Sequence, residues 1–470
     1  MKAIVDYLRT GILTTWNILA YILSGGNYLP LEGRVRGGVF RNWIGRYRYR
    51  PSQIAHPASH QELADLIQQS QHVRLFGAGH SFNDGIISEE TLISLDRYSG
   101  VLWRDDETKQ MAVKGGTRVR DVAAALHKVG WAFAALPSHN AQSMGGILST
   151  DVHGTGRDWG FVSESIVGMT IVNGRGQIIE CQPEDPLFQA AIGGIGAVGI
   201  IAEVIVQAVD RFNIEQKVEA AKLAEVAPNL DQLIQANDHF SLYLFPFTDD
   251  CQINTWNRTT KRQSILGPQR ELLSNTIDAL LAGWLGDPMA YSGRLPAISP
   301  YIHRFRKGTN LVLESAEGFN RNLYHLHQEL EFTVPYEQTF AAARRFLKLY
   351  EDMYPQGLPY TLLELRFTPA GHNCTLLGAG QVQSSTWINL VTNDLPGYEE
   401  YFAAAEQIVK EIGGRPHLGK YCRGWTNADF QRLYPERFAT FQELMQEHDP
   451  QGKFANPLTR RLFKPLARVC

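Results

Sequence analysis

Four stretches of the chain combine glycine with polar or titratable side chains: FGAGHSFND (76–84), LPSHNAQSMGGILSTDVHGTG (136–156), LELRF (363–367) and RPHLGK (415–420). Two closely spaced glycines in the first stretch allow the backbone to approach a phosphate. Small residues and hydroxyls in the second stretch let several backbone N–H groups point at one anion. Together the two stretches could enclose a pyrophosphate, which indicates a large, flat cofactor.

Glu364 and Arg366 stand two residues apart on a predicted strand, so their side chains share one face of that strand. Such a pair can be a simple ion pair, or it can line a substrate pocket. Lys420 ends the fourth stretch and could equally be an ordinary surface lysine. His80 could cap its turn or attach to a cofactor. The residue types alone leave these alternatives open.

One sequence, Gly194-Ile-Gly-Ala-Val-Gly199, matches the dinucleotide fingerprint letter for letter. That fingerprint requires a strand before the glycines and a helix after them. Here DPLFQAAIG predicts a helix before, and the β-branched IIAEVIVQAV predicts a strand after. We therefore predict a tight helix-to-strand turn, whose backbone could still lie against a cofactor, rather than a nicotinamide site.

The elements that must position these stretches form two regions of an α+β protein. From about 50 to 210, short helices and β-branched runs alternate, with a hairpin predicted around residues 173–176. From about 211 to 400, several edge-type strands and a long helix at 339–353 predict an antiparallel sheet with helices on one face. Residues 258–310 are irregular except for a helix and are predicted to be an insertion. The predicted domains are an N-terminal helical extension (1–40), a first domain (41–210), a second domain (211–400) and a C-terminal segment (401–470).

Composition restricts the class of protein. The chain has 470 residues, 44% hydrophobic and 20% charged, which is typical of a soluble globular protein with more than one core. A net charge of −3 disfavours a nucleic-acid partner. Five scattered cysteines indicate neither a disulfide framework nor a metal site, so we expect a reducing, cytoplasmic location.

The N-terminal 25 residues are predicted to form one amphipathic helix. An apolar stripe recurs at helical spacing through Ile4, Leu8, Ile12, Trp16, Leu19 and Leu23. The apolar run is too short to span a bilayer comfortably. The stripe therefore either docks on the protein's own body or lies on a membrane surface, which would make the protein a peripheral membrane protein.

Read together and in order, the motifs resemble the vanillyl-alcohol-oxidase-type flavoproteins, and most closely the sugar 1,4-lactone and alditol oxidases among them. The resemblance runs from NWIGRYRYRP (42–51) to DPQGKFANP (449–457) and includes ELEFTVPYE (329–337) and TWINL (386–390). It implies a two-part FAD-binding domain of the PCMH type in the first region. It also implies that the antiparallel sheet caps the substrate and that the C-terminal segment completes the flavin site.

The resemblance also implies a role for each motif residue. His80 is the covalent anchor to FAD, and Glu364, Arg366 and Lys420 are the catalytic residues that orient a sugar lactone or polyol and stabilise charge. The expected cofactor-binding residues are Gly77, Ala78, Gly79, His80, Ser81, Pro137, Ser138, Ser143, Gly146, Ser149, Thr150, His153, Gly199, Ile201 and His417.

The implied reaction is oxidation of a secondary alcohol on a sugar 1,4-lactone, as in the D-arabinono-1,4-lactone oxidases, with a hydride passing to flavin N5. Pro137 stands where the family controls oxygen access, which favours oxygen as acceptor and hydrogen peroxide as product. Trp387 replaces a histidine of the alditol oxidases and favours a lactone pocket, while Leu418 replaces the family's usual tryptophan. The alternatives are an alditol oxidase, a membrane-associated dehydrogenase that reduces a quinone or cytochrome, and a binding module without catalysis.

Overall fold

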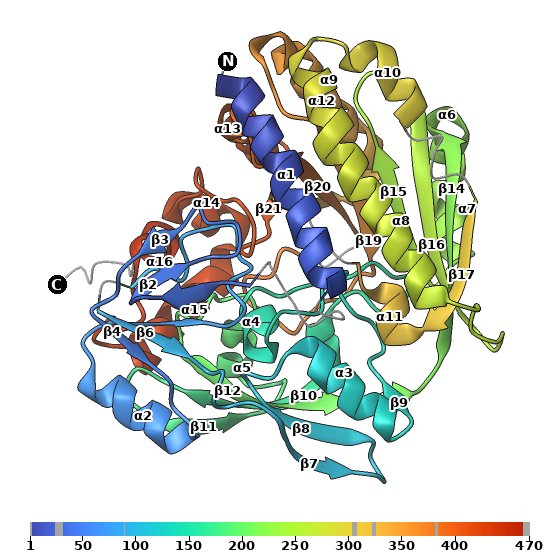
Figure 1. Cartoon of the computed structure of the whole chain (residues 1–470). Helices are drawn as coiled ribbons and strands as arrows, with labels where there is room; N and C mark the ends of the chain where they lie inside the picture. The colour runs from blue at the N-terminus through green and yellow to red at the C-terminus, as the bar shows by residue number, and fades with distance from the viewer. Residues whose placement is uncertain are drawn as a thin grey trace.

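The computed structural model describes residues 2–23, 32–88, 90–302, 308–321, 326–380 and 384–463. Within these residues the strands form five sheets in two bodies, and the small sheets lie below the large one in Figure 1. The N-terminal helix stands in front of the large sheet's helices, and the C-terminal helices lie against the small sheets. The fold is therefore of the predicted α+β class.

The first body begins with three parallel strands in the order β4-β6-β5. These are β4 (Gln53–Ala55), β5 (Val73–Phe76) and β6 (Thr91–Ser94). Helix α2 (His60–Gln69) crosses from β4 to β5, and the Ser59 side chain caps it by accepting a hydrogen bond from the Glu62 amide. Its apolar face, with Leu63 and Ile67, packs against the sheet and brings the end of β5 to the GAGHS turn.

A five-stranded antiparallel sheet in the order β11-β10-β12-β8-β7 completes the first body. Its strands are β7 (Val101–Asp105), β8 (Gln110–Lys114), β10 (Ile166–Val172), β11 (Ile178–Cys181) and β12 (Ile200–Gln207). The predicted hairpin joins β10 to β11, with Gly176 at φ +72° and the Asn173 side chain accepting from two turn amides. The associated elements are α3 (Val119–Lys128), β9 (Trp131–Ala132), α4 (Met144–Ser149), η1 (Val162–Ser165), α5 (Pro186–Ala191) and β13 (Val209–Asp210).

The glycine run at 194–199 lies between α5 and β12, in the predicted order of helix and then strand. Gly199 has φ +156°, and a Cβ there would come within 2.5 Å of Ile171. The glycines thus serve a tight turn into a buried strand, as the sequence predicted.

The second body is an eight-stranded antiparallel sheet in the order β17-β14-β16-β15-β19-β20-β18-β21. Its strands are β14 (Asn213–Lys222), β15 (His239–Leu244), β16 (Asp250–Thr259), β17 (Thr309–Glu314), β18 (His327–Pro335), β19 (Thr361–Thr368), β20 (Ser385–Asn393) and β21 (Arg415–Pro416). Side chains alternate across it: Phe332 packs on Phe346 of α12 (Thr339–Met353), with ring centroids 4.8 Å apart, whereas Glu331 faces the other way. Polar residues of β18, β19 and β20 therefore share the face directed at the first body.

The insertion is more regular and slightly shorter than predicted. Residues 258 and 259 still belong to β16, which corrects the predicted start. The helices that follow are α8 (Gly267–Leu281), the π-helical segment η3 (Ala282–Gly286), α9 (Asp287–Tyr291) and α10 (Leu295–Ile302). Helix α1 (Lys2–Leu23) packs against α8, η3 and α9. No helix in the described parts of the chain is both long and apolar enough to cross a membrane.

The C-terminal segment returns to the first body. The Lys453 side chain donates to the carbonyls of Ile67 and Gln68 at the end of α2, and the Val73 amide donates to the Lys453 carbonyl. The remaining elements are β1 (Arg34–Arg36), β2 (Val39–Arg41), β3 (Arg48–Tyr49), α6 (Leu223–Val226), η2 (Ala227–Asn229), α7 (Leu230–Gln235), α11 (Ser315–Phe319), η5 (Tyr336–Gln338), η6 (Tyr354–Gln356), α13 (Tyr398–Glu411), α14 (Asn427–Leu433), α15 (Pro435–His448) and α16 (Pro457–Phe463).

Candidate active site

A cavity with an empty volume of about 1500 Å³, part of it open to solvent, is lined by residues from both bodies. Its wall combines the glycine-rich segments of the first body with the charged strands of the second, so one extended ligand could contact both bodies. The structure places every predicted site residue on its wall: Gly77, Ala78, Gly79, His80, Ser81, Pro137, Ser138, Ser143, Gly146, Ser149, Thr150, His153, Gly199, Ile201, Glu364, Arg366, His417 and Lys420.

Glycines make the narrow part of the wall. A Cβ on Gly77 would lie 2.0 Å from the Ser143 hydroxyl, so only glycine lets these two segments meet. Gly79 adopts φ +64°, and a Cβ there would lie 2.7 Å from the Cα of Gly33. The Ser143 hydroxyl accepts a 3.3 Å hydrogen bond from the Gly146 amide and so fixes the first turn of α4. The backbone is thus held close to whatever occupies this part of the cavity.

Arg74 holds three distant segments of the wall together. Its buried guanidinium donates to the carbonyl oxygens of Gly85 (2.7 Å), Ile195 (2.7 Å) and Phe454 (2.9 Å). Burial lowers the pKa of Arg74 to about 10, which leaves it charged at neutral pH. The sequence did not predict this role of Arg74. A single arginine within strand β5 belongs to no motif, and its three carbonyl partners come together only when the chain folds.

His80 contacts a second histidine. Its Nε2 lies 3.0 Å from Nε2 of His139, and its ring stacks on Trp43 with centroids 5.6 Å apart. Burial, followed by the neighbouring charge of His139, holds the pKa of His80 well below its usual range, and burial lowers the pKa of His139 to about 4. Both rings are therefore neutral at pH 7, the form in which an imidazole nitrogen can act as a nucleophile.

The opposite end of the cavity carries charge. Arg366 on β19 forms an ion pair with Glu331 on β18, and its Nε lies 3.9 Å from a Glu364 oxygen. Lys420 forms an ion pair with Glu329 and lies 3.8 Å from the second oxygen of Glu331. The register places Glu364 opposite Asn389, and Asn389 opposite Glu331, so three adjacent strands supply one polar patch.

These charges set one another's protonation. Burial alone would raise the pKa of Glu331, but the charges of Arg366, His153 and Lys420 outweigh it and hold this pKa well below the usual range. Burial likewise opposes ionisation of Glu329, and Lys420 and His327 overcome it and lower its pKa. Both carboxylates are therefore ionised, and they hold the two cations in place.

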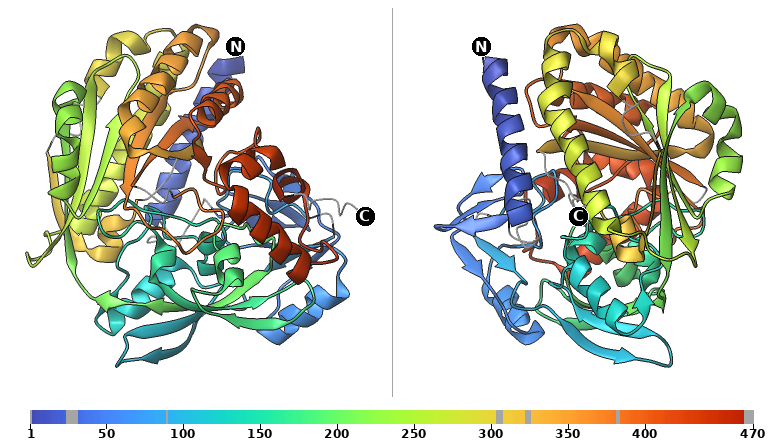
Figure 2. Two further views of the ribbon diagram at one scale, coloured as in Figure 1. Left: turned by 180° about the vertical axis from the view of Figure 1, so that it is seen from behind. Right: turned by 45° about the vertical axis from the view of Figure 1, so that its right-hand side comes forward.

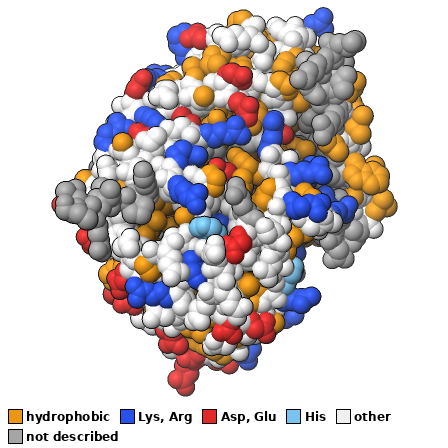
Figure 3. All heavy atoms as spheres, turned by 90° about the vertical axis from the view of Figure 1, so that its left-hand side faces the viewer, with side chains coloured by type: hydrophobic (Ala, Val, Ile, Leu, Met, Phe, Trp, Pro, Cys, Tyr) orange, Lys and Arg blue, Asp and Glu red, His pale blue; other side chains and the backbone are white. Residues whose placement is uncertain are grey.

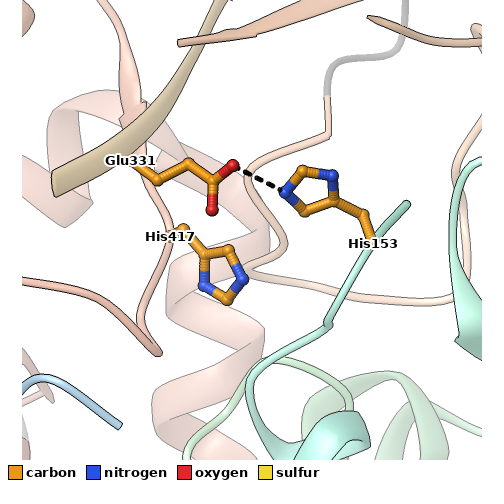
Figure 4. Close-up of side chains that lie close together, drawn as sticks. All are labelled: His153, Glu331 and His417. Atoms are coloured by element: carbon orange, nitrogen blue, oxygen red, sulfur yellow. Dashed lines mark ion pairs between the residues drawn. The ribbon is translucent and has the colours of Figure 1, made fainter. Parts of the chain in front are cut away.

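Glu331 lies between the imidazoles of His153 and His417 (Figure 4). His153 Nε2 is 3.3 Å from a Glu331 oxygen, and the three side chains offer ligand atoms within 4.8 Å of one another, close enough to hold a metal ion. The Glu331 carboxylate already pairs with Arg366 and lies 3.8 Å from Lys420, so a metal ion would have to compete with two fixed cations for it. Burial lowers the pKa of His417 to about 3, which keeps this ring neutral beside the cations. We interpret the group as an ion-pair network.

The loop that carries Lys420 is fixed by the GAGHS segment. The Asn83 side chain donates to the carbonyls of Leu418 (2.6 Å) and Lys420 (3.1 Å), and the Phe82 amide donates to Gly419. The Gly419 amide donates to His417 Nδ1 at 3.0 Å. The first and fourth sequence motifs therefore form one wall, with Lys420 aimed at the carboxylates of β18.

One expectation about specificity changes. Trp387 does not line this cavity: it is 1% exposed and stacks on the cavity residue His153, with centroids 3.6 Å apart. Trp387 therefore cannot select the substrate by direct contact, whereas Leu418 does line the cavity. The residue of β20 that reaches the cavity is Asn389. It stands two residues after Trp387 on the same face of the strand, but the sequence did not identify it.

Further lining residues that sequence reasoning missed are Trp43, His139, His327, Glu329 and Glu331. Glu329 and Glu331 alternate with Leu330 and Phe332, and this alternation in ELEFTVPYE was the available signal. His327 begins β18 and continues the same alternation with Glu329 and Glu331, whereas His139 lies in the loop before α4 and carried no periodic signal.

The cavity fits FAD on its own chemistry. The glycine-lined part suits a close approach by a pyrophosphate, and the buried polar atoms Gln142 Oε1, His139 Nδ1 and Asn389 Oδ1, all on lining residues, make no hydrogen bond within the described residues. Such atoms are ready partners for a polar cofactor or substrate.

Comparison with known proteins agrees with this geometry. Residues 51–182 match the FAD binding domain, and residues 204–462 match the D-arabinono-1,4-lactone oxidase model. The fold resembles the solved cholesterol oxidase of Brevibacterium sterolicum, with a TM-score of 0.77 at 15% identity over 93% of this chain and 98% of that one. The molecule is an FAD-dependent oxidoreductase whose FAD-binding domain is followed by an antiparallel-sheet domain. Within that class, the chain belongs to the D-arabinono-1,4-lactone oxidase family.

Individual relatives are similar over nearly their whole length. L-gulonolactone oxidase of Bos taurus is 27% identical over 449 residues, which cover 91% of this chain and 99% of the relative. L-gulono-1,4-lactone dehydrogenase of Mycobacterium tuberculosis is also 27% identical, with the same coverage. D-arabinono-1,4-lactone oxidase of Eremothecium gossypii is 28% identical over 518 residues, which cover 92% of this chain and 96% of the relative.

Proposed function

We propose that this enzyme oxidises a secondary hydroxyl of a sugar-derived 1,4-lactone to a ketone and uses oxygen as electron acceptor. The observation that carries the proposal is the convergence of Glu364, Arg366 and Lys420 at one end of the cavity whose other end is lined by glycines. When bound, FAD would supply the hydride acceptor at N5. Two further proposals follow the family: FAD is attached through His80, and Pro137 on the cavity wall admits oxygen, which is reduced to hydrogen peroxide.

The chain's own residues would bind and orient the substrate. Arg366 and Lys420 are held by buried carboxylates, so their positive charges stay fixed where an alkoxide develops. Glu364 is half-buried, and among the described residues its nearest ion-pair contact is the 3.9 Å distance to Arg366, so its carboxylate remains available to accept the hydroxyl proton. Wall residues from both bodies would keep the reacting C–H bond close to the cofactor.

Anaerobic reduction of the bound flavin tests the proposal. D-arabinono-1,4-lactone or L-gulono-1,4-lactone should bleach the flavin absorbance, and a linear alditol should not. Glu364→Gln should slow bleaching by roughly 100-fold because proton removal is lost, without loss of bound flavin. Glu337→Gln, on the exposed turn after β18, is the matched control and should behave as the unchanged enzyme. Bleaching by alditols alone would make the chain an alditol oxidase, and bleaching by neither would refute the function.

A second candidate differs in the electron acceptor. The relative from Mycobacterium tuberculosis is named a dehydrogenase, so the similar proteins are not all named oxidases. In this candidate a quinone or cytochrome accepts the electrons in place of oxygen. Rapid mixing of the reduced enzyme with oxygen or with a soluble quinone decides between them: faster reoxidation by the quinone would favour the dehydrogenase.

A further inference from the structure

Helix α1 is inverted relative to an ordinary surface helix. Its buried residues are small or polar: Gly11, Thr14 at 1% exposure and Asn17 at 8%, joined by Ile18. Its exposed residues are large and apolar: Leu8, Ile12, Trp16, Leu19, Ile22 and Leu23, which are 40–85% exposed. From Leu8 to Leu23 the predicted apolar stripe thus faces outward, while the helix docks on the protein through the opposite face; the side chain of Ile4 lies outside the described residues. An isolated exposed leucine needs no explanation, but a whole helical stripe does.

The adjoining helix has the same inversion. On α8 the buried side includes Glu271 and Asn275, which are hydrogen-bonded to each other, while Leu273 and Ile277 are 59% and 48% exposed. Trp284 on η3, seven residues after Ile277, continues this stripe and is 42% exposed. Two neighbouring helices therefore turn their polar sides inward and their apolar sides outward.

Trp284 connects the two stripes. Its indole N–H donates to Thr15 at 3.1 Å, and a Cβ on Gly11 would lie 2.8 Å from its ring. Gly283 also lies against α1, where a Cβ would be in ordinary van der Waals contact, 3.7 Å from the Gly11 Cα. Gly11 lets the Trp284 ring pack against α1, so the exposed apolar side chains of α1 lie beside those of α8 and η3 and make an apolar surface with them. We name this surface, made of Leu8, Ile12, Trp16, Leu19, Leu23, Leu273, Ile277 and Trp284, the apolar helix face.

Positive charge lies on the same side of the molecule. The sheet β1-β2-β3 follows α1 in the chain and stands beside it in the right-hand view of Figure 2. Its Arg34, Arg36, Arg48 and the adjoining Arg50 are exposed, and none forms an ion pair with another described residue. Figure 3 shows hydrophobic side chains and Lys or Arg side chains next to one another on one side of the molecule.

We propose that the apolar helix face and the arginines of β1–β3 dock this enzyme peripherally on a lipid bilayer that carries anionic headgroups. An amphipathic helix with an apolar face and basic neighbours binds at the boundary between headgroups and acyl chains, and its affinity grows with buried apolar area and with anionic lipid. Trp16 and Trp284 suit that boundary because an indole is apolar with one polar N–H. These exposed arginines, which pair with no carboxylate in the described part of the chain, favour a lipid surface over a second copy of the chain, because a symmetric contact at this side would bring like charges together.

Co-sedimentation of the full-length flavin-loaded enzyme with vesicles tests the proposal. The enzyme should pellet with vesicles of phosphatidylcholine and phosphatidylglycerol, and more weakly with phosphatidylcholine alone or at high salt. The triple variant Ile12→Gln, Trp16→Gln, Leu19→Gln should bind at least ~10-fold more weakly. Its flavin reduction in solution should be unchanged, since these residues lie outside the cavity wall.

A matched control is offered by β7, where Val101, Leu102 and Trp103 are also exposed, at 39–46%. Changing these three to glutamine should leave vesicle binding unchanged. The proposal is overturned if the unchanged enzyme stays in the supernatant with anionic vesicles, or if both triple variants bind as it does. A dimer in analytical ultracentrifugation that the α1 variant alone dissociates, without vesicle binding, would assign the face to a second copy instead.

Discussion

His80 and His139 share one hydrogen bond between two Nε2 atoms, so one ring must donate a proton and the other must accept it. If His80 donates, its Nδ1 keeps a lone pair and is the nucleophilic atom. His139 then acts as a positioning residue that selects this tautomer, in the way that histidine partners commonly fix which nitrogen is free. The motif spacing predicted His80, whereas His139 becomes relevant only when two segments 59 residues apart are folded together.

His139→Ala should therefore reduce covalent attachment of FAD while leaving the cavity able to bind it. We expect the flavin retained in acid-precipitated protein to fall several-fold, because His80 loses the acceptor that holds its tautomer. His80→Ala should abolish retention altogether, and His60→Ala, at the surface, should change nothing. Full retention in the His139 variant would show that His80 needs no partner.

At the scale of elements, the period of two along a strand predicted that Glu364 and Arg366 share a face, and β19 confirms it. The same period could not show that Asn389 and Glu331 lie beside them, because strand order and register depend on pairings between distant segments. Trp387 illustrates the limit: it stands on the cavity side of β20, yet His153 from the other body covers it. The local sequence predicts which face of a strand a side chain occupies, but it does not predict which distant segment covers that face.

The insertion is tied to the sheet through Asp287 at the start of α9. This buried carboxyl accepts from the Tyr360 amide at 3.0 Å and from the Asn393 side chain at 2.6 Å. Burial raises the pKa of Asp287 to about 7, from 3.8. Between pH 3.8 and about pH 7, Asp287 keeps its proton in the folded state but has released it in the unfolded state. This group therefore makes the stability of the fold decrease as the pH rises through that range.

Asp287→Asn should remove that pH dependence. In urea unfolding, the difference in unfolding free energy between the enzyme and the variant should change by on the order of 2 kcal/mol between pH 4 and pH 7. Asp106→Asn changes an exposed carboxyl on the β7–β8 turn and serves as the control. Its unfolding free energy should depend on pH in the same way as that of the unchanged enzyme. If the unfolding free energy of Asp287→Asn also follows the pH dependence of the unchanged enzyme, the Asp287 carboxyl is ionised throughout this pH range.

At the scale of the whole molecule, the two bodies are also joined just outside the cavity wall, by His372 and Asp151. His372 follows β19, its Nε2 lies 2.9 Å from Asp151 beside α4, and its ring stacks on Phe161 with centroids 3.5 Å apart. Glu164 lies 3.8 Å from its other nitrogen. Burial alone would lower the pKa of His372, but the Asp151 charge outweighs it and raises the pKa to about 10.

This pair should stabilise the fold fully below pH ~6.5, where the unfolded histidine is also protonated, and progressively less as pH rises toward 10. His372→Gln should lower the unfolding free energy by about 3 kcal/mol at pH 6, because Asp151 loses its buried partner, and the deficit should shrink toward pH 10. His56→Gln breaks a partly exposed pair with Asp96 and should cost less than about 1 kcal/mol. A deficit that stays constant with pH would mean that His372 is neutral in the folded enzyme.

The guanidinium of Arg74 contacts carbonyls at both ends of the chain order: Gly85 near the beginning, and Phe454 close to the end, 380 residues away. The cavity wall is therefore incomplete until the segment around Phe454 has been made and folded onto β5. Cofactor capture thus depends on a segment that follows every motif of the flavin cradle in the chain. A polypeptide cut before that segment would have all of these motifs and still lack a closed cradle, so possession of the cofactor reports that this segment is present and folded.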